Sequence, residues 1–266
     1  MAKKSKSVPQ PAQYEERIVA FIDILGFKAL IQSTDTQDED KNTRAIQEVL
    51  DIYEEIETRL VDQLQEMMGT VDITRFSDCI VISFPARQSD GLFELTLALS
   101  WFHLDIFMRF NVLIRGAITQ GKLIHTKDLV FGPAMNRAYE LESTVAIFPR
   151  IIIDNIVFQG RIDWFANEED GEVRHQIRNE MNTLLENDGD EVLSLDTDDF
   201  YYVDYIGKIA GEMDDPETQF PVYMKKLSHI VEKNIGSKNA SISKKYQWIA
   251  NKIQPYLDFQ SQKKTD

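Results

Sequence analysis

Near its start the chain reads Ile18-Val19-Ala20-Phe21-Ile22-Asp23-Ile24-Leu25-Gly26-Phe27, an apolar run that one carboxylate interrupts. The unbroken apolar stretch before Asp23 predicts a buried β-strand, and the glycine suits the turn that follows it. A second carboxylate, Asp78, lies between two β-like runs (71–76 and 79–84) that predict a hairpin. Two carboxylates on adjacent strands would suit a pair of hard divalent ions, Mg²⁺ or Mn²⁺, held against phosphates.

Composition narrows the class of protein. The chain has 266 residues, enough for one large domain or for one domain with an appendage. Its hydrophobic content of 43% and charged content of 27% are typical of a soluble globular protein. The net charge of −15 argues against non-specific binding of nucleic acid, which needs a basic surface. The single Cys79 excludes an internal disulfide and fits a reducing cytoplasm.

No segment predicts a membrane location. The first seven residues carry three lysines and lead to Pro9 without an apolar segment, so they match neither a signal peptide nor an anchor. The most apolar stretch, 92–110, is interrupted by charged residues. We therefore expect a cytoplasmic protein that binds neither membrane nor nucleic acid.

The hydrophobic periodicity of the first 155 residues predicts an α+β fold. Their predicted order is β-α-α-β-β-α-β, with the antiparallel hairpin in the middle. This order is typical of a ferredoxin-like antiparallel sheet with helices packed on one face. The predicted helices are 27–32, 44–68, 92–109 and 133–145, and the predicted strands beyond the hairpin are 112–119 and 122–126, joined through Gly121, and 150–154.

The rest of the chain is less regular. We expect a surface loop at 33–42, a helix at 173–185, strands at 192–195 and 200–206, and two closing helices at 222–234 and about 242–253. With no long linker and no repeat, these closing helices are expected to pack on the same core. The predicted organisation is a disordered tail (1–14), a main domain (15–210) and a C-terminal helical extension (211–266).

Four motifs together resemble the class III nucleotidyl cyclases. The run from Phe21 to Phe27 is similar to the first-strand motif of that family. Arg75-Phe76-Ser77-Asp78-Cys79 is similar to its hairpin, and the run from Ile114 to Gly121 matches the strand that follows. The segment Phe131-Gly132-Pro133-Ala134-Met135-Asn136-Arg137-Ala138-Tyr139-Glu140-Leu141-Glu142-Ser143 is similar to its helix-opening motif. The likeness covers about residues 17 to 155, and it makes residues 15–210 the expected cyclase domain.

This resemblance implies a site and a reaction. Two divalent metal ions, Mn²⁺ or Mg²⁺, would support attack of the ribose 3′-hydroxyl on the α-phosphorus, with pyrophosphate as leaving group. Each site in the family forms between two chains, so the resemblance implies a homodimer with two composite sites. The implied site residues are Asp23, Ile24 and Asp78 for metal; Gly26, Phe27 and Arg115 for phosphate; Thr74, Arg75 and Leu129 for the base; and Asn136 and Arg137 for catalysis.

Departures from the family pattern bear on the substrate. Thr74 and Leu129 stand where purine cyclases read the base, and they cannot form the adenine or guanine contacts. Glu140 stands where the family has a transition-state arginine, so another cation such as Arg137 or Lys122 would have to replace it. The combination resembles the bacterial Pycsar pyrimidine cyclases, which make cyclic UMP or cyclic CMP during phage infection for a separate effector protein. We expect UTP ahead of CTP, because Thr74 and Arg75 can each donate a hydrogen bond to a uracil carbonyl.

Other interpretations stay open at this point. Asp23 and Asp78 could be ordinary turn residues, Asn136 a surface residue, and Arg115 half of a structural ion pair. A catalytically inactive cyclase-like domain that binds nucleotide would explain Glu140, and another two-metal nucleotidyl transferase is a third hypothesis. The four histidines show no ligand spacing, so no metal is assigned to them.

Overall fold

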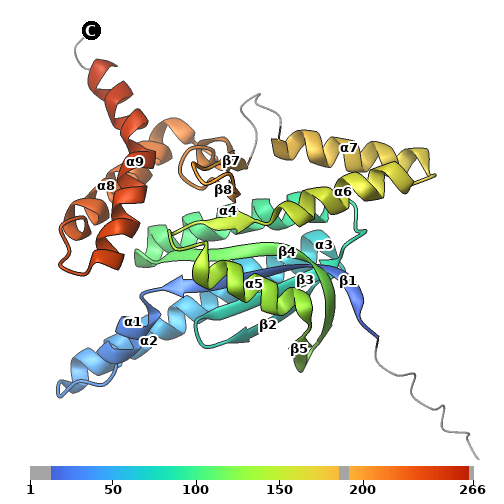
Figure 1. Ribbon diagram of the computed structural model, residues 1–266. Helices are drawn as coiled ribbons and strands as arrows, with labels where there is room; N and C mark the ends of the chain where they lie inside the picture. Colours follow the sequence, from blue (N-terminus) through green and yellow to red (C-terminus); the bar gives the residue numbers. More distant parts are fainter. Residues whose placement is uncertain (1–12, 186–191, 264–266) are drawn as a thin grey trace, which may run out of the picture.

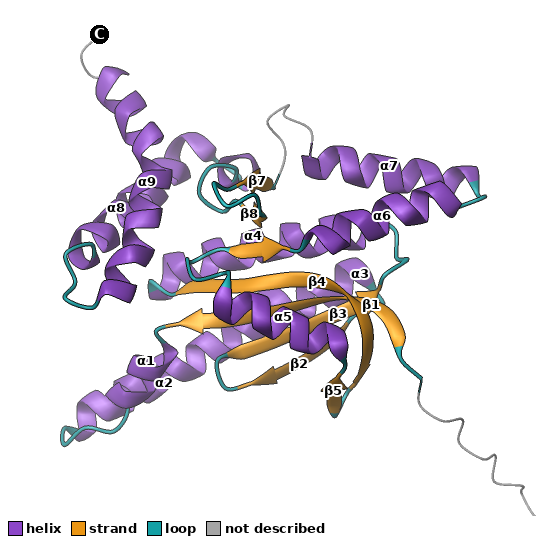
Figure 2. Ribbon diagram, viewed as in Figure 1, coloured by secondary structure: helices purple, strands orange, loops and turns teal. Residues whose placement is uncertain are grey.

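The computed structural model describes residues 13–185 and 192–263 (Figures 1 and 2). Residues 1–12 of the expected tail and the acidic segment 186–191 lie outside the described residues. The fold is α+β, as predicted, with one eight-stranded sheet in the order β2-β3-β1-β4-β6-β8-β7 and β5 paired to β4. All described pairings are antiparallel except the one between β4 and β6.

Four neighbouring strands, with β2 at the edge, form the first part of this sheet. They are β1 (Glu15–Leu25), β2 (Asp72–Phe76), β3 (Cys79–Pro85) and β4 (Leu113–Thr126). Their spatial order, β2-β3-β1-β4, is the ferredoxin-like order expected from the sequence. The strand β1 lies in the middle and pairs along most of its length with both β3 and β4, which explains its unbroken apolar run.

One face of the sheet carries the helices of the first half. They are α1 (Phe27–Ser33), α2 (Glu39–Ile56), a π-helical turn (Glu57–Val61), α3 (Asp62–Met68) and α4 (Gly91–Phe110). Alternate residues of β1 point into this layer, so Ile18, Ala20 and Ile22 belong to the main hydrophobic core. Among the described helices, α4 alone is long and apolar enough to span a membrane by composition, and 61% of its apolar window is buried in the structure.

The opposite face is covered as well, so the expectation of helices on one face is wrong. Helix α5 (Pro133–Thr144) lies across β1 and β4 on that side (Figure 2). Ala134 and Ala138 pack there against Val19 and Phe21, the residues of β1 that alternate with the main core. Small residues on α5 let the helix approach closely, and Pro133 at its start agrees with the sequence prediction.

The second half of the chain extends the sheet and adds a second core. Its elements are β5 (Leu129–Phe131), β6 (Ile151–Ile153), α6 (Asn155–Asn167), α7 (Gly171–Leu185), β7 (Leu193–Leu195), β8 (Tyr201–Val203), a 3-10 turn (Ile209–Glu212), α8 (Pro216–Asn234) and α9 (Ala240–Lys263). Helices α8 and α9 contribute Tyr223, Leu227 and Ile249 to a buried cluster that also holds Leu113 and Ala117 of β4. The C-terminal helices therefore share apolar packing with the central sheet.

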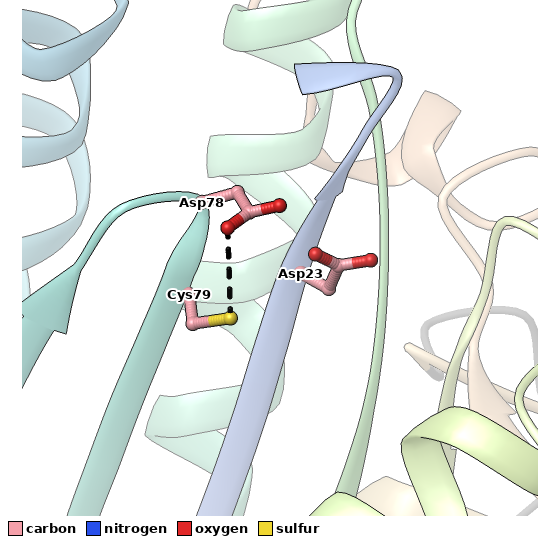
Figure 3. Close-up of side chains that lie close together, drawn as sticks. All are labelled: Asp23, Asp78 and Cys79. Atoms are coloured by element: carbon pink, nitrogen blue, oxygen red, sulfur yellow. Dashed lines mark hydrogen bonds between the residues drawn. The ribbon is translucent and has the colours of Figure 1, made fainter. Parts of the chain in front are cut away.

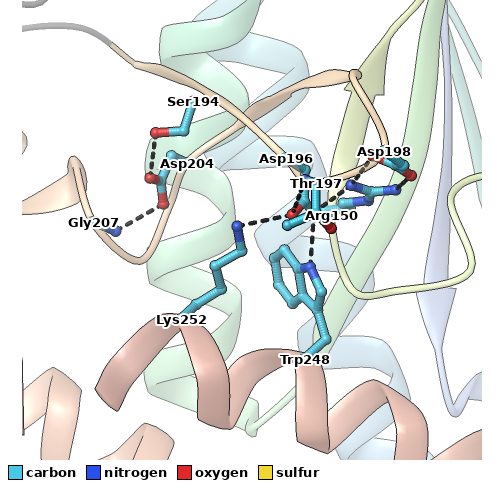
Figure 4. Close-up of polar contacts among 9 residues, drawn as sticks. All are labelled: Arg150, Ser194, Asp196, Thr197, Asp198, Asp204, Gly207, Trp248 and Lys252. Carbon is cyan, nitrogen blue, oxygen red and sulfur yellow. Dashed lines mark hydrogen bonds and ion pairs between the residues drawn. The ribbon is translucent and has the colours of Figure 1, made fainter. Parts of the chain in front are cut away.

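A buried polar network joins α9 to the sheet extension (Figure 4). Arg150, which precedes β6 and is fully buried, forms ion pairs with Asp196 and Asp198 after β7. Asp196 also accepts hydrogen bonds from Trp248 Nε1 at 2.8 Å and from Lys252 Nζ at 3.0 Å. A buried arginine is tolerated only when paired, so α9 is fixed by charge as well as by apolar contacts.

Local details differ from the sequence expectation. Residues 113–126 form one continuous strand rather than two, because Gly121 remains paired with Arg17 of β1. The loop expected at 33–42 ends early, since the side chain of Asp38 accepts from the Lys41 amide and starts α2 at Glu39. Helix α6 and strand β5 were not expected, because α6 has little amphipathic pattern and β5 has three residues.

His103 gives the fold a predictable response to acid. It is buried on α4 and stacked on Tyr205, with ring centroids 3.4 Å apart, and burial lowers its pKa to about 3. The unfolded chain takes up this proton near pH 6.5, so below that pH protonation favours unfolding. We expect His103→Phe to remove a stability loss of about 1 kcal/mol between pH 6.5 and 5.5, which steepens toward about 1.4 kcal/mol per pH unit at lower pH. Urea unfolding against pH measures it, with exposed His229→Phe as control; an unchanged slope in His103→Phe would contradict the assignment.

Candidate active site

The two aspartates predicted as metal ligands lie side by side at one end of the central strands (Figure 3). Asp23 is paired in register with Cys79 on β3 and with Arg115 on β4. Asp78 lies in the turn that precedes Cys79, and its carbonyl accepts a 3.1 Å hydrogen bond from the Ile24 amide. Ligand atoms of Asp23, Asp78 and Cys79 all lie within 4.8 Å of one another.

The electrostatics of this group favour a bound cation. Burial raises the pKa of Asp23, the neighbouring Asp78 adds to the rise, and the Arg115 guanidinium only partly offsets it. Burial also raises the pKa of the Cys79 thiol, to about 12, and both carboxylates act in the same direction. The thiol is therefore protonated at neutral pH, which leaves the two carboxylates as ligands.

The donor set fits a hard divalent ion. Two half-buried carboxylates whose ligand atoms lie within 4.8 Å of each other supply the oxygen ligands that Mg²⁺ and Mn²⁺ prefer. Ile24, the third residue expected at the metal, has its side chain in the main core, so only its backbone carbonyl could take part. A bound ion would place positive charge where burial now disfavours the ionised form of Asp23.

Arg115, expected to contact phosphate, is held between two carboxylates. Its Nε donates to Asp23 Oδ2 at 3.0 Å, and its second terminal nitrogen lies 2.5 Å from Glu142 Oε1. Glu142 comes from α5 and is buried, and burial raises its pKa while Arg115 opposes the rise. Glu142 therefore fixes the guanidinium beside Asp23.

The turn after β1 is built on a glycine in a left-handed conformation. Gly26 has φ of 85°, a left-handed conformation that side chains with a Cβ seldom adopt. Phe27 begins α1 directly afterwards, with its ring 6.1 Å from that of Tyr53. Tyr53 donates a 2.8 Å hydrogen bond to the carbonyl of Ser77, so the turn beside Asp23 and the hairpin beside Asp78 are braced through α2.

An open pocket of about 770 Å³ adjoins the hairpin. Such a volume falls within the range of roughly 300–1,000 Å³ that small-molecule ligands occupy. Thr74 and Arg75, predicted to read the base, line it together with Ser77, Tyr53 and Lys127. Arg75 forms an ion pair with Glu57 across the pocket, whereas Lys127 is exposed at the turn between β4 and β5.

The remaining predicted residues do not meet the aspartates within one chain. Asn136 is exposed on α5, six residues before Glu142 and so about 9 Å nearer the start of that helix. Arg137 donates to Asp154 at 3.0 Å and lies 3.7 Å from Glu140. Leu129 is exposed on β5 opposite Thr126.

Three residues at the site were missed from the sequence. Glu142 carries no spacing signal, because its role depends on where α5 crosses β4. Lys245 of α9 is half-buried and near enough for its charge to affect the pKa of Asp23 and Glu142. His125, set aside because it lacks ligand spacing, contacts Thr74.

No family model and no curated protein sequence matches the chain. Among solved structures, the adenylyl cyclase CyaB from P. aeruginosa is 19% identical, with 57% of this chain and 82% of that chain covered at a TM-score of 0.40. The adenylate/guanylate cyclase/hydrolase from Silicibacter pomeroyi is also 19% identical, with the same coverage and a TM-score of 0.42.

A third similar structure is the guanylate cyclase domain of RhGC from Catenaria anguillulae in complex with GTP. It is 18% identical, covers 56% of this chain and 84% of that chain, and has a TM-score of 0.41. Similarities of this size are too distant to assign an activity. The proposal below therefore rests on the motifs and the site geometry of this chain.

Proposed function

We propose that the protein is a nucleotidyl cyclase that converts UTP to 3′,5′-cyclic UMP and pyrophosphate. The observation that carries the proposal is the pairing of Asp23 and Asp78, whose ligand atoms lie within 4.8 Å, beside a pocket lined by Thr74 and Arg75. These residues belong to the motifs that resemble the class III cyclases. The pocket is lined by hydroxyl and cationic groups and also by the carboxylates of Glu54 and Glu57, of which Glu57 forms an ion pair with Arg75.

The reaction needs positioning and charge rather than a covalent intermediate. Asp23 and Asp78 would hold two divalent ions, which when bound polarise the phosphate oxygens and acidify the ribose hydroxyl. The 3′-oxygen attacks the α-phosphorus in line, its proton is lost, and the bond to the β,γ-pyrophosphate breaks. Arg115 lies next to Asp23, and Glu142 holds its guanidinium in a fixed direction beside the reacting phosphates.

We propose that each site is shared between two copies of the chain. In one copy, Asn136 and Asp23 stand apart and Asn136 is exposed, so a second copy would have to supply the ribose contact. The same side of the sheet exposes large apolar side chains that a second copy would cover. These are Phe76 (49% exposed), Leu129 (52%), Phe131 (41%) and Tyr139 (57%).

Base choice is tested by competition among the four nucleoside triphosphates. Thr74 and Leu129 offer none of the paired polar contacts that adenine or guanine needs, and a mismatched base leaves polar groups unpaired. With equal concentrations of ATP, GTP, CTP and UTP plus Mn²⁺, we expect cyclic UMP as the main product and cyclic CMP second. Cyclic AMP or cyclic GMP as the main product would refute the pyrimidine assignment. Cyclic CMP in excess would refute only the order of the two pyrimidines.

A catalytically inactive, nucleotide-binding signalling domain is the second candidate. Glu140 favours it, because an acidic residue replaces the transition-state arginine that the resemblance implies. Arg137 is also occupied with Asp154 and Glu140. The two candidates differ in one measurable property, because only the active enzyme releases pyrophosphate.

The biological role is proposed from the resemblance alone. A cytoplasmic pyrimidine cyclase of the Pycsar type would make its cyclic nucleotide during phage infection. A separate effector protein would then bind the product. The acidic chain, with a net charge of −15, supports a role that involves neither nucleic acid nor anionic membrane.

A further inference from the structure

The hydroxyl of Thr74 ends a chain of hydrogen bonds that starts at Arg17. Arg17 Nε donates to Ser83 Oγ at 2.9 Å, Ser83 Oγ lies 2.8 Å from His125 Nδ1, and His125 Nε2 lies 2.9 Å from Thr74 Oγ1. Arg17, Ser83 and His125 are exposed by only 4%, 0% and 8%. Water therefore does not compete for these groups, and each buried donor needs an acceptor within the chain.

The direction of hydrogen bonding along this chain follows from Arg17. A guanidinium has donors only, so Ser83 Oγ must accept at that end. Among the described residues, the hydroxyl hydrogen of Ser83 has one acceptor within reach, Nδ1 of His125. Burial lowers the pKa of His125, so the ring is neutral and carries its one proton on Nε2. That Nε2–H donates to Thr74 Oγ1, and the hydroxyl hydrogen of Thr74 is left for another acceptor.

The side chain of Arg17 is itself held in place by its partners. The direction of hydrogen bonding from Arg17 to Thr74 is therefore set by the fold. Its terminal nitrogens donate to Asp72 Oδ2 at 2.5 Å, to the Ser83 carbonyl at 2.9 Å and to Glu15 Oε2 at 2.9 Å. These partners come from three neighbouring strands of the central sheet. The guanidinium cannot turn to offer Ser83 anything except a donor.

We propose that Arg17, Ser83 and His125 form a relay that sets Thr74 as a hydrogen-bond donor toward the nucleotide base, so that the pocket selects a carbonyl over an amine. The proposal rests on the cyclase function given above. It deepens that function by assigning base preference to three residues that are not themselves predicted to contact the base. Uracil presents a carbonyl where cytosine presents an amine. The opposite imidazole tautomer would use the Thr74 hydrogen internally and leave the oxygen to accept from an amine.

The first test is the tautomer itself and needs no turnover. Protein labelled with ¹⁵N-histidine is examined by NMR at neutral pH, and the His125 signals are identified by their loss in His125→Gln. We expect a neutral ring protonated on Nε2. A ring protonated on Nδ1, or on both nitrogens, would overturn the relay.

The second test is the ratio of kcat/KM for UTP to that for CTP. We expect His125→Phe and Ser83→Ala each to lower this ratio by about tenfold, since Thr74 is then free to accept. His125→Gln should keep most of the preference, because its side-chain amide can still donate to Thr74. Matched controls are His175→Phe on the surface of α7 and Ser100→Ala, a buried serine of α4 outside the relay.

The Thr74→Val variant shows whether a changed UTP/CTP ratio comes from loss of the relay or from a general loosening of the pocket. In that background His125→Phe should change the ratio no further, because the relay then has no group to orient. A wild-type ratio in His125→Phe, or a further change on top of Thr74→Val, would overturn the relay while the cyclase assignment stands. A wild-type protein that forms no cyclic nucleotide overturns the proposed function, and the specificity assignment with it.

Discussion

Replacing Asp23 or Asp78 by alanine is expected to abolish cyclic nucleotide formation, with a loss of at least about a thousandfold, which corresponds to several kcal/mol in the transition state. Each substitution removes one of the two carboxylates whose ligand atoms lie within 4.8 Å. A single remaining carboxylate cannot align two ions against one triphosphate. Product formation from UTP and Mn²⁺, followed by chromatography, measures the loss.

Loss of metal binding must be separated from loss of the fold. In the wild-type protein, Mn²⁺ is expected to raise the melting temperature, because a ligand that binds the folded state stabilises it by mass action. Asp78→Ala should keep a cooperative melting transition that Mn²⁺ no longer shifts, whereas Asp35→Ala, an exposed loop aspartate, should behave as wild type. Near-wild-type turnover in either Asp23→Ala or Asp78→Ala would rule out the two-metal assignment.

Mixing two inactive variants is expected to restore activity. Asp23→Ala and Asn136→Ala damage opposite halves of a composite site, so a mixed dimer keeps one intact site of two. If subunits pair at random, half of the dimers are mixed, and recovery should approach about a quarter of wild-type activity. The measurement is turnover of the mixture after subunit exchange, with exchange followed by a fluorescent label on one variant.

The matched control for that experiment uses two variants of the same half-site. Asp23→Ala mixed with Asp78→Ala should stay inactive, because every mixed dimer then has two damaged metal sites. If the Asp23→Ala and Asn136→Ala mixture also stays inactive although exchange is shown, the shared-site hypothesis is wrong. Asn136 would then be the surface residue that its exposure in one chain also allows.

The sequence predicted the centre of the fold because that region obeys local rules. The apolar run of β1 requires burial on both faces, the hairpin is marked by two β-like runs, and Pro133 marks the start of α5. The first two features place Asp23 near the end of β1 and Asp78 in the hairpin turn. The two carboxylates come together because β3 pairs with β1 over a long sequence separation, and their role as metal ligands stays a prediction.

The rest of the site depends on contacts between segments far apart in the chain. Glu142 reaches Arg115 only because α5 crosses the face of β4 opposite the other helices. His125 reaches Ser83 and Thr74, residues 42 and 51 positions away. Lys245 reaches the site only because α9 packs on the second core. Hydrophobic periodicity does not predict contacts between segments that are far apart in the chain. The prediction that the helices lie on one face of the sheet was wrong for the same reason.

Identification of the products from UTP tests the central claim most directly. Purified wild-type protein is incubated with UTP and Mn²⁺, and both products are quantified by mass spectrometry and a pyrophosphate assay. The account predicts cyclic UMP and pyrophosphate in equal amounts, with no UDP, because the 3′-oxygen and not water attacks the α-phosphorus. Unchanged UTP would contradict the account, and so would UMP or UDP formed without cyclic nucleotide.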